Sequence, residues 1–366
     1  MARAQRLHIG IAGAGLLGRL LAWTLSHQGH DVSVFDPAPG PQPAFDGQGA
    51  AGFTAAGMLS PLAELESADA DVAQRGWHAI RRWAQIDATL SERVHKLPSF
   101  AQLGSLMVAH GADLGAARRV LARLDDAQAG DAIRQPQVLS AAQLQQIEPS
   151  LHGTSGPLHA WMLHGEGHID TVRTMQCLHD DAPGVHWHWG QAVHALGPGH
   201  MDITHVQGMG PSPSRTGFDW VFDVRGVGAR PDLPVRGVRG EVVWLHAPGV
   251  NLQRPVRLLH PRHRVYIVPR PGDVVLVGAS EIESEDRSPV SLRSAVELMA
   301  AAHSVIPALA EARILRLDAN LRPALPDHRP IIHVEPGLVR INGLYRHGWL
   351  LGPSLMDEAL ARAGLA

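Results

Sequence analysis

The hydrophobic pattern changes its period twice between residues 8 and 36. An apolar run from His8 to Ala12 is typical of a buried strand, and it leads into the glycine-rich segment 13–18. Apolar residues then recur at helical spacing, before a second apolar run from Asp31 to Phe35 that predicts another strand. This order predicts a βαβ unit, the building block of doubly wound α/β folds.

The segment Gly13-Ala14-Gly15-Leu16-Leu17-Gly18 lies where the first strand turns into the helix. Gly13 permits a tight turn, Gly15 lets backbone N–H groups approach a pyrophosphate, and Gly18 lets the helix pack closely on the strand. Unpaired N–H groups and the macrodipole favour an anion at that helix end. Asp36, at the end of the second strand, is placed to accept hydrogen bonds from adenosine ribose hydroxyls. The segment predicts a dinucleotide site, and a glycine-rich turn without a ligand is the alternative.

A run of small residues, 47–60, follows the second strand. Backbone can approach a flat ligand closely where side chains are small. A flexible loop of low complexity is the alternative that these residues leave open.

Helical and strand patterns fall into separate blocks further along the chain. Residues 71–94 and 113–129 show helical spacing, and the first of these carries a stripe expected to lie in the core: Trp77, Ile80, Trp83 and Ile86. Between residues 187 and 227 the pattern turns to short β segments broken by Gly-Pro-rich turns such as 208–214. The remaining expected elements are a buried strand at 221–228 ending in glycines, strands at 240–245, 264–269 and 274–278, and a helix at 291–303.

Composition is consistent with a soluble enzyme of two intertwined domains. The chain has 366 residues, of which 45% are hydrophobic and 18% charged, with a formal charge of −3. The 32 basic residues are spread among 35 acidic ones without a basic run, so no nucleic-acid partner is expected.

Cysteine content and hydropathy set the expected compartment. The single cysteine, Cys177, excludes an intramolecular disulfide and fits a reducing cytoplasm. Residues 1–25 superficially resemble a signal peptide, but Arg19 interrupts the apolar stretch and no convincing cleavage site follows. No segment has the roughly 18 uncharged apolar residues that a membrane span requires. We therefore expect a cytoplasmic protein without a membrane helix.

Two close histidine pairs raise the question of a metal site: His186 with His188, and His260 with His263. Neither pair comes with nearby carboxylates or with a helical HExxH arrangement. We expect scattered surface histidines and no metal.

The C-terminal third contains four distinctive segments, at 264–270, 277–281, 320–327 and 343–353. In this order they resemble segments of the glycine oxidases of thiamine biosynthesis, which belong to the D-amino-acid oxidase family of FAD-dependent oxidoreductases. Ala55-Ala56-Gly57-Met58-Leu59 also looks like the flavin-lining loop of that family. The resemblance covers nearly the whole chain.

The resemblance implies an α/β (α+β) fold with two domains. A Rossmann-like FAD-binding domain would be discontinuous in sequence, and the second domain would be built on an antiparallel sheet that roofs the flavin. The implied assignment is 1–75, 141–230 and 318–366 to the FAD-binding domain, and 76–140 and 231–317 to the substrate-binding domain.

The resemblance also assigns the site. Arg322 looks like the guanidinium that pairs with the substrate carboxylate, Tyr266 adds a hydroxyl donor, and Arg346 resembles the arginine at the entrance to the flavin site. A planar clamp suits a carboxylate and would aim the substrate Cα–H at the flavin. Backbone N–H groups from Arg346 to Leu350 would lie near the flavin pyrimidine, where a helix start stabilises the reduced ring. The residues expected to bind FAD are Gly13, Ala14, Gly15, Leu16, Leu17, Gly18, Asp36, Ala55, Ala56, Gly57, Met58, Leu59, Val193, Gly226, Gly228, Arg346, His347, Gly348, Trp349 and Leu350.

The implied activity is oxidative deamination of glycine or another small amino acid, in which dioxygen reoxidises the flavin and yields hydrogen peroxide. The implied partners are the small amino acid and dioxygen, while a homo-oligomer and a thiazole synthase that receives the imine are left open. Three alternatives remain. They are a D-amino-acid or sarcosine dehydrogenase with a non-oxygen acceptor, a nicotinamide dehydrogenase, and a non-catalytic FAD-binding sensor or subunit.

Three residues depart from the family pattern. Glu281 stands where an apolar or small residue is common, Asn320 replaces a common glycine, and Leu344 replaces a histidine. Glu281 could face the pocket and attract a cationic amine, or lie at a solvated strand end. Arg322 as a solvated turn residue and Tyr266 as a packed strand aromatic are likewise left open by the residues alone.

Overall fold

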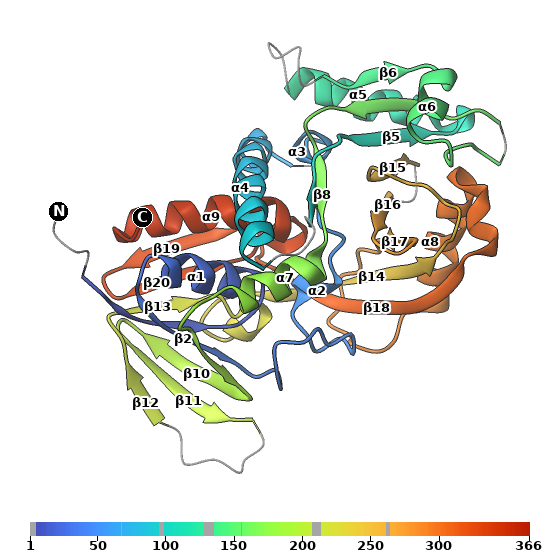
Figure 1. Ribbon diagram of the computed structural model, residues 1–366. Coiled ribbons are helices and arrows are strands. Elements are labelled where there is room, and N and C mark those ends of the chain that lie inside the picture. The colour runs from blue at the N-terminus through green and yellow to red at the C-terminus, as the bar shows by residue number, and fades with distance from the viewer. Residues whose placement is uncertain are drawn as a thin grey trace.

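The computed structural model describes residues 5–66, 68–94, 99–127, 135–154, 156–206, 214–260 and 264–366. Figure 1 shows a six-stranded sheet with its helices on the left and an eight-stranded sheet on the right. The expected α/β architecture with a second, antiparallel sheet is therefore confirmed. Most of the expected Gly-Pro-rich turn at 208–214, and His263, lie outside the described residues.

The six-stranded sheet begins with the predicted βαβ unit. β1 (His8–Ala12) and β2 (Asp31–Asp36) pair in parallel and α1 (Leu16–His27) connects them, so this prediction is confirmed. Their central residues are buried because other elements cover both faces of the sheet. β19 is antiparallel to β20 and the other pairs are parallel, in the order β19 (Ile331–Glu335), β20 (Leu338–Asn342), β13 (Trp220–Asp223), β1, β2 and β9 (His186–Trp189).

Helices pack against α1 on one face of this sheet. They include α4 (Ala70–Val94), α7 (Thr171–Asp180) and α9 (Gly348–Ala363). The predicted stripe on α4 is in the core, and the Trp83 indole N–H donates to the Trp349 carbonyl oxygen at 2.8 Å. The meander on the other side contains β10 (Gln191–Gly197), β11 (His200–His205) and β12 (Ser214–Gly217).

The eight-stranded sheet contains the strands expected at 240–245, 264–269 and 274–278. Its pairs are antiparallel except for β15 with β5. The order is β18 (Arg313–Ala324), β14 (Arg236–His246), β17 (Val274–Gly278), β16 (Arg264–Arg270), β15 (Val256–Leu259), β5 (Ser105–Ala109), β7 (His159–Leu163) and β6 (Gln137–Leu139). β7 lies within the 141–230 segment assigned to the FAD-binding domain yet pairs here. The proposed domain boundaries stay a prediction.

Helices also cover the eight-stranded sheet. α8 (Leu292–Val305) accounts for the helix expected at 291–303, and α5 (Leu114–Ala127) for that expected at 113–129. α6 (Ala141–Ile147) begins with a capping box at Ser140.

Short elements connect the two halves of the molecule. A three-stranded sheet has the order β3 (Met58–Leu59), β8 (Gly167–Ile169) and β4 (Phe100–Ala101). The small-residue run forms α2 (Ala51–Thr54) and β3, so it is not a wholly irregular loop. α3 (Pro61–Glu64) follows directly and carries a carboxylate that becomes important at the site.

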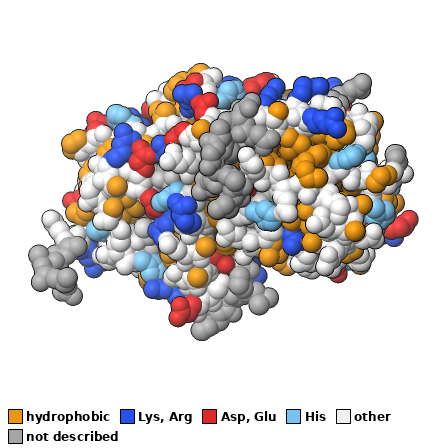
Figure 2. Space-filling model, turned by 90° about the horizontal axis from the view of Figure 1, so that it is seen from above, with side chains coloured by type: hydrophobic (Ala, Val, Ile, Leu, Met, Phe, Trp, Pro, Cys, Tyr) orange, Lys and Arg blue, Asp and Glu red, His pale blue; other side chains and the backbone are white. Residues whose placement is uncertain are grey.

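The surface and the helices give no sign of a membrane span. Within the described parts of the chain, none of the helices combines the length and apolar character needed to cross a membrane. Figure 2 shows one face on which acidic, basic and hydrophobic side chains are interspersed.

Candidate active site

One large cavity, of about 1220 Å³, joins the carboxyl ends of the parallel strands to the eight-stranded sheet. Arg322, Tyr266 and Arg346 all line it. The expected FAD-binding residues line it too, except Gly18 and Leu59, which lie behind its wall. The fold therefore brings together residues that the sequence predicts as one site but scatters between positions 13 and 350.

The glycine-rich segment forms one end of this cavity. Gly13 has a positive φ of 103°, and a Cβ there would lie 2.8 Å from the Val224 carbonyl oxygen. A Cβ at Gly18 would lie 1.8 Å from the Gly13 carbonyl oxygen, so this glycine serves close packing of α1 on the turn. α1 begins after Gly15 without a side-chain cap, which suits a phosphate at its N-terminus.

Asp36 is held beside this turn by the backbone. Its Oδ2 accepts from the Ala14 N–H at 2.6 Å, and its Oδ1 accepts from the Ala38 N–H at 2.8 Å. Each carboxylate oxygen has a further lone pair, so ribose hydroxyls can still bind. The carboxylate thus shapes the turn as well as facing the cavity.

Arg19 was expected only as an interruption of an apolar stretch, but it organises this end of the cavity. Its guanidinium is buried and donates to the carbonyl oxygens of Ala14, Met175 and Pro41 at 2.8–2.9 Å. Burial lowers its pKa to about 10, against the opposing charge of Asp36. It ties α1, α7 and the loop after β2 together.

The meander and β13 complete the wall at this end. Val193 of β10 lines the cavity, and its carbonyl oxygen accepts from Arg225 Nη1 at 3.1 Å. Gly226 and Gly228 lie in a 3₁₀ turn (Gly226–Ala229) directly after β13. Arg225 also pairs with the fully buried Asp223 at 2.9 Å, which fixes the turn.

The small-residue loop is fixed from both sides. Asn320, which departs from the family pattern, donates through Nδ2 to the Gly49 carbonyl oxygen at 3.0 Å and to Thr54 Oγ1 at 3.1 Å. Arg270 Nη2 donates to the Ala56 carbonyl oxygen at 2.5 Å, and burial lowers the Arg270 pKa to about 10. Ala55 to Met58 are thereby held along the cavity.

Arg322 and Tyr266 extend over glycines of intervening strands. Arg322 is on β18, and a Cβ at Gly240 on β14 would lie 2.3 Å from its Cζ. Tyr266 is on β16, and a Cβ at Gly278 on β17 would lie 2.7 Å from its ring. The two glycines leave room for both side chains over the sheet.

Arg322 lacks an acidic partner within the described residues. Its Nη1 donates to the carbonyl oxygens of Ser280 at 3.1 Å and Arg239 at 3.4 Å. Burial raises the pKa of the Tyr266 hydroxyl, and the positive charge of Arg322 partly offsets this effect. The hydroxyl therefore remains protonated at neutral pH and is able to donate.

Arg346, in contrast, is already paired with acids. Its Nη2 lies 2.7 Å from Glu64 Oε2, and its Nη1 lies 3.4 Å from Glu281 Oε2. Glu281 lines the cavity with 47% of its side chain exposed, so it is more than a solvated strand end. Leu344, the third departure from the family pattern, is buried.

Glu64 is a site residue that the sequence analysis missed. Its Oε2 lies 2.9 Å from His347 Nε2, in addition to its contact with Arg346, and its Oε1 lies 3.8 Å from Arg257 Nη1. Its only sequence signal is its position a few residues after the flavin-loop motif. Gly240 and Gly278 were missed because the glycine positions acquire meaning only from the strand register.

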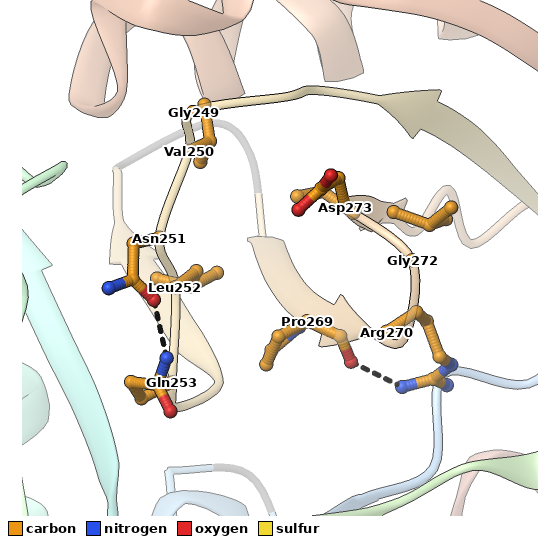
Figure 3. Close-up of a pocket in the computed structure, with 11 residues that line it drawn as sticks. Gly249, Val250, Asn251, Leu252, Gln253, Pro269, Arg270, Gly272 and Asp273 are labelled. Carbon is orange, nitrogen blue, oxygen red and sulfur yellow. Dashed lines mark hydrogen bonds between the residues drawn. The ribbon is translucent and has the colours of Figure 1, made fainter.

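A second cavity, of about 300 Å³, lies elsewhere on the eight-stranded sheet (Figure 3). It is lined by 249–253 and 269–275 and contains none of the predicted site residues. Figure 3 shows the Arg270 guanidinium donating back to the Pro269 carbonyl oxygen, at 3.1 Å. A search of the described residues finds no histidine, cysteine and carboxylate group arranged to hold a metal.

Comparison with known proteins agrees with this site. The family model described as FAD dependent oxidoreductase matches residues 8–361. A thiamine biosynthesis oxidoreductase, ThiO, from Rhizobium etli is 36% identical over 357 residues, which cover 97% of this chain and 96% of the relative. A bifunctional ThiO/ThiG protein from a Nostoc species is 25% identical over 355 residues, covering 94% of this chain and 51% of the relative.

A third relative supplies a solved structure. The glycine oxidase from Geobacillus kaustophilus is 24% identical over 372 residues, covering 95% of this chain and 90% of the relative. Its crystal structure matches with a TM-score of 0.79 over 98% of this chain and 95% of that chain, at 22% identity. The shared fold includes both sheets that enclose the cavity.

Proposed function

The chain belongs to the family of FAD-dependent oxidoreductases, and from this premise we propose that it oxidises glycine or another small amino acid to an imino acid. FAD is its cofactor. The imino acid would hydrolyse to an oxo acid and ammonia. Dioxygen is the proposed electron acceptor, with hydrogen peroxide as the second product.

The observation that carries the proposal is the environment of Arg322. Its guanidinium faces the cavity and has backbone carbonyl partners only, among the described residues. A buried guanidinium of this kind is stabilised by an anionic ligand that it can bind through two parallel N–H groups. Because Arg346 already contacts two carboxylates, Arg322 is the better candidate to receive the substrate carboxylate.

The protein's own groups orient the reactants. Arg322 would bind the carboxylate and Tyr266 would donate its hydroxyl to the same group, which fixes the position of Cα. The N-termini of α1 and α9 face the cavity and favour negative charge, at the pyrophosphate and at the reduced ring. Bound FAD supplies the chemistry, by accepting a hydride equivalent from Cα.

We further propose a place for the reaction in thiamine biosynthesis, with a thiazole synthase as the enzyme that uses the imine. The relative from Rhizobium etli is described as a thiamine biosynthesis oxidoreductase. The relative from Nostoc is described as a bifunctional ThiO/ThiG protein, and this chain matches about half of its length. A fusion of that kind is consistent with transfer of a short-lived product between two active sites.

The test is an amino-acid screen of the FAD-loaded protein that follows peroxide in air and loss of flavin absorbance under nitrogen. We expect glycine, sarcosine and D-alanine to give the fastest peroxide release. Bleaching without peroxide would indicate a dehydrogenase with another acceptor. A flavin that no amino acid bleaches would indicate a sensor or subunit.

A further inference from the structure

Glu64 contacts two consecutive residues of the proposed flavin site from a distant part of the chain. Its Oε2 lies 2.7 Å from Arg346 Nη2 and 2.9 Å from His347 Nε2. Arg346 and His347 directly precede α9, and His347 is the N-cap residue of that helix. One carboxylate oxygen therefore fixes the approach to the α9 N-terminus.

Glu64 is ionised in the folded protein. Burial alone would raise its pKa, but the hydrogen bond to His347 and the charges of Arg346 and Arg257 hold it well below its usual range. The side chain is 19% exposed and lines the cavity, so its negative charge is only weakly screened by water.

The backbone that carries Glu64 is itself anchored. Glu166 is fully buried, and its Oε1 accepts from the Leu62 N–H at 2.7 Å and from the Ala63 N–H at 3.1 Å. Its Oε2 accepts from Ser105 Oγ at 2.5 Å. These bonds fix the start of α3, so Glu64 is held by a rigid support rather than by a mobile loop.

We propose that Glu64 is a positioning residue that holds Arg346 and His347 against the flavin and sets the reduction potential of bound FAD. The proposal rests on the proposed function, because that function places Arg346 and His347 at the flavin. Reduced flavin carries negative charge, which Arg346 stabilises and Glu64 opposes. Loss of the Glu64 charge should make the flavin easier to reduce.

The experiment is an anaerobic redox titration of the FAD-loaded protein without amino acid. We expect Glu64→Gln to raise the ratio of reduced to oxidised flavin at a fixed solution potential about tenfold, or ~30 mV for a two-electron couple. Glu66→Gln is the matched control. It removes the same charge two residues away, where the carboxylate pairs with Arg257 at 3.0 Å, and should change the ratio less than about threefold.

Two further variants separate charge from folding. Glu64→Asp keeps the charge, so its potential should stay near that of the native protein. Arg346→Gln removes the positive charge that Glu64 holds, so its potential should fall. An unchanged or lower potential in Glu64→Gln, or an equal shift in Glu66→Gln, would overturn the proposal.

The remaining outcomes also decide the matter. If Glu64→Gln does not retain FAD, an unchanged or raised potential in Arg346→Gln overturns the proposal, and a lowered one supports it. Amino-acid oxidation is tested separately by bleaching. A native protein that shows these shifts but is bleached by no amino acid would contradict the proposed function alone.

Discussion

A side chain at position 240 and the guanidinium of Arg322 would compete for the same space. A Cβ built on Gly240 lies 2.3 Å from Arg322 Cζ and 2.6 Å from Nη1, distances that real Cβ atoms do not show. The glycine of β14 therefore permits the orientation of an arginine on the neighbouring strand. This contact gives a way to move Arg322 without replacing it.

Gly240→Ala should displace the Arg322 guanidinium from the floor of the cavity. We expect KM for glycine to rise at least about tenfold, because a charge-assisted hydrogen bond contributes roughly 1.5–3 kcal/mol. FAD affinity should change little. Gly217→Ala is the control, since a Cβ on that strand glycine would meet only Gly199, 3.9 Å away. Equal kinetic losses in both variants would contradict the predicted displacement.

Arg322→Ala should damage substrate use while FAD stays bound. The expected loss in kcat/KM for glycine is at least about tenfold, and larger if misorientation also slows hydride transfer. Arg322→Lys should restore only part of the activity, because an ammonium keeps the charge but loses the planar fork. Steady-state kinetics and flavin absorbance measure these two effects.

Simple amines without a carboxylate provide the internal control for Arg322. Their turnover, already poor in the native protein, should barely change in Arg322→Ala. Equal losses for glycine and for such amines would show that Arg322 has a structural role, and its assignment to the carboxylate would be withdrawn.

Arg19→Met should lower both stability and FAD affinity. The substitution removes the donors for three backbone carbonyl oxygens, and each buried unsatisfied group costs about 1–3 kcal/mol. The loop that ends at Pro41 would lose its anchor beside the cavity. Thermal unfolding with and without FAD measures both effects. Arg293→Met, at an 85% exposed arginine, should leave both unchanged. A native-like FAD affinity in Arg19→Met would contradict the anchoring role.

Glu166 should make stability depend on pH. Burial raises its pKa from 4.5 to about 7, while hydrogen bonds from Ser105, Ala63 and Leu62 partly offset the rise. Between these values the unfolded chain ionises while native Glu166 holds its proton. The native state therefore loses stability as pH rises from about 4.5 to 7, by up to about 3 kcal/mol.

Glu166→Gln should flatten this pH dependence. The amide oxygen can still accept from the backbone of α3, and the amide nitrogen can donate to Ser105 Oγ. Urea unfolding at pH 5 and pH 8 should show a smaller difference for the variant than for the native protein. The same difference in both proteins would mean that other groups carry the pH dependence.

Much of the FAD-binding half could be predicted from the sequence. The βαβ unit is encoded locally, because the periods of strand and helix and the turn chemistry of Gly13 lie within one short segment. The core stripe on α4 follows in the same way from helical spacing. The sequence did not show the pairing of β7 in the eight-stranded sheet, because strand pairing depends on contacts between segments far apart in the chain.

The sequence by itself determined which residue types the site contains: the glycine-rich turn, Asp36, Tyr266, and the arginines at 322 and 346. Local order and resemblance are sufficient for that. Only the tertiary structure decided which arginine is already paired and which lacks an acidic partner in the described chain, because Glu64 approaches Arg346 from α3 while Arg322 contacts backbone carbonyls alone. It also decided that Gly240 makes room for Arg322, since register between strands, rather than spacing along the chain, sets which atoms meet.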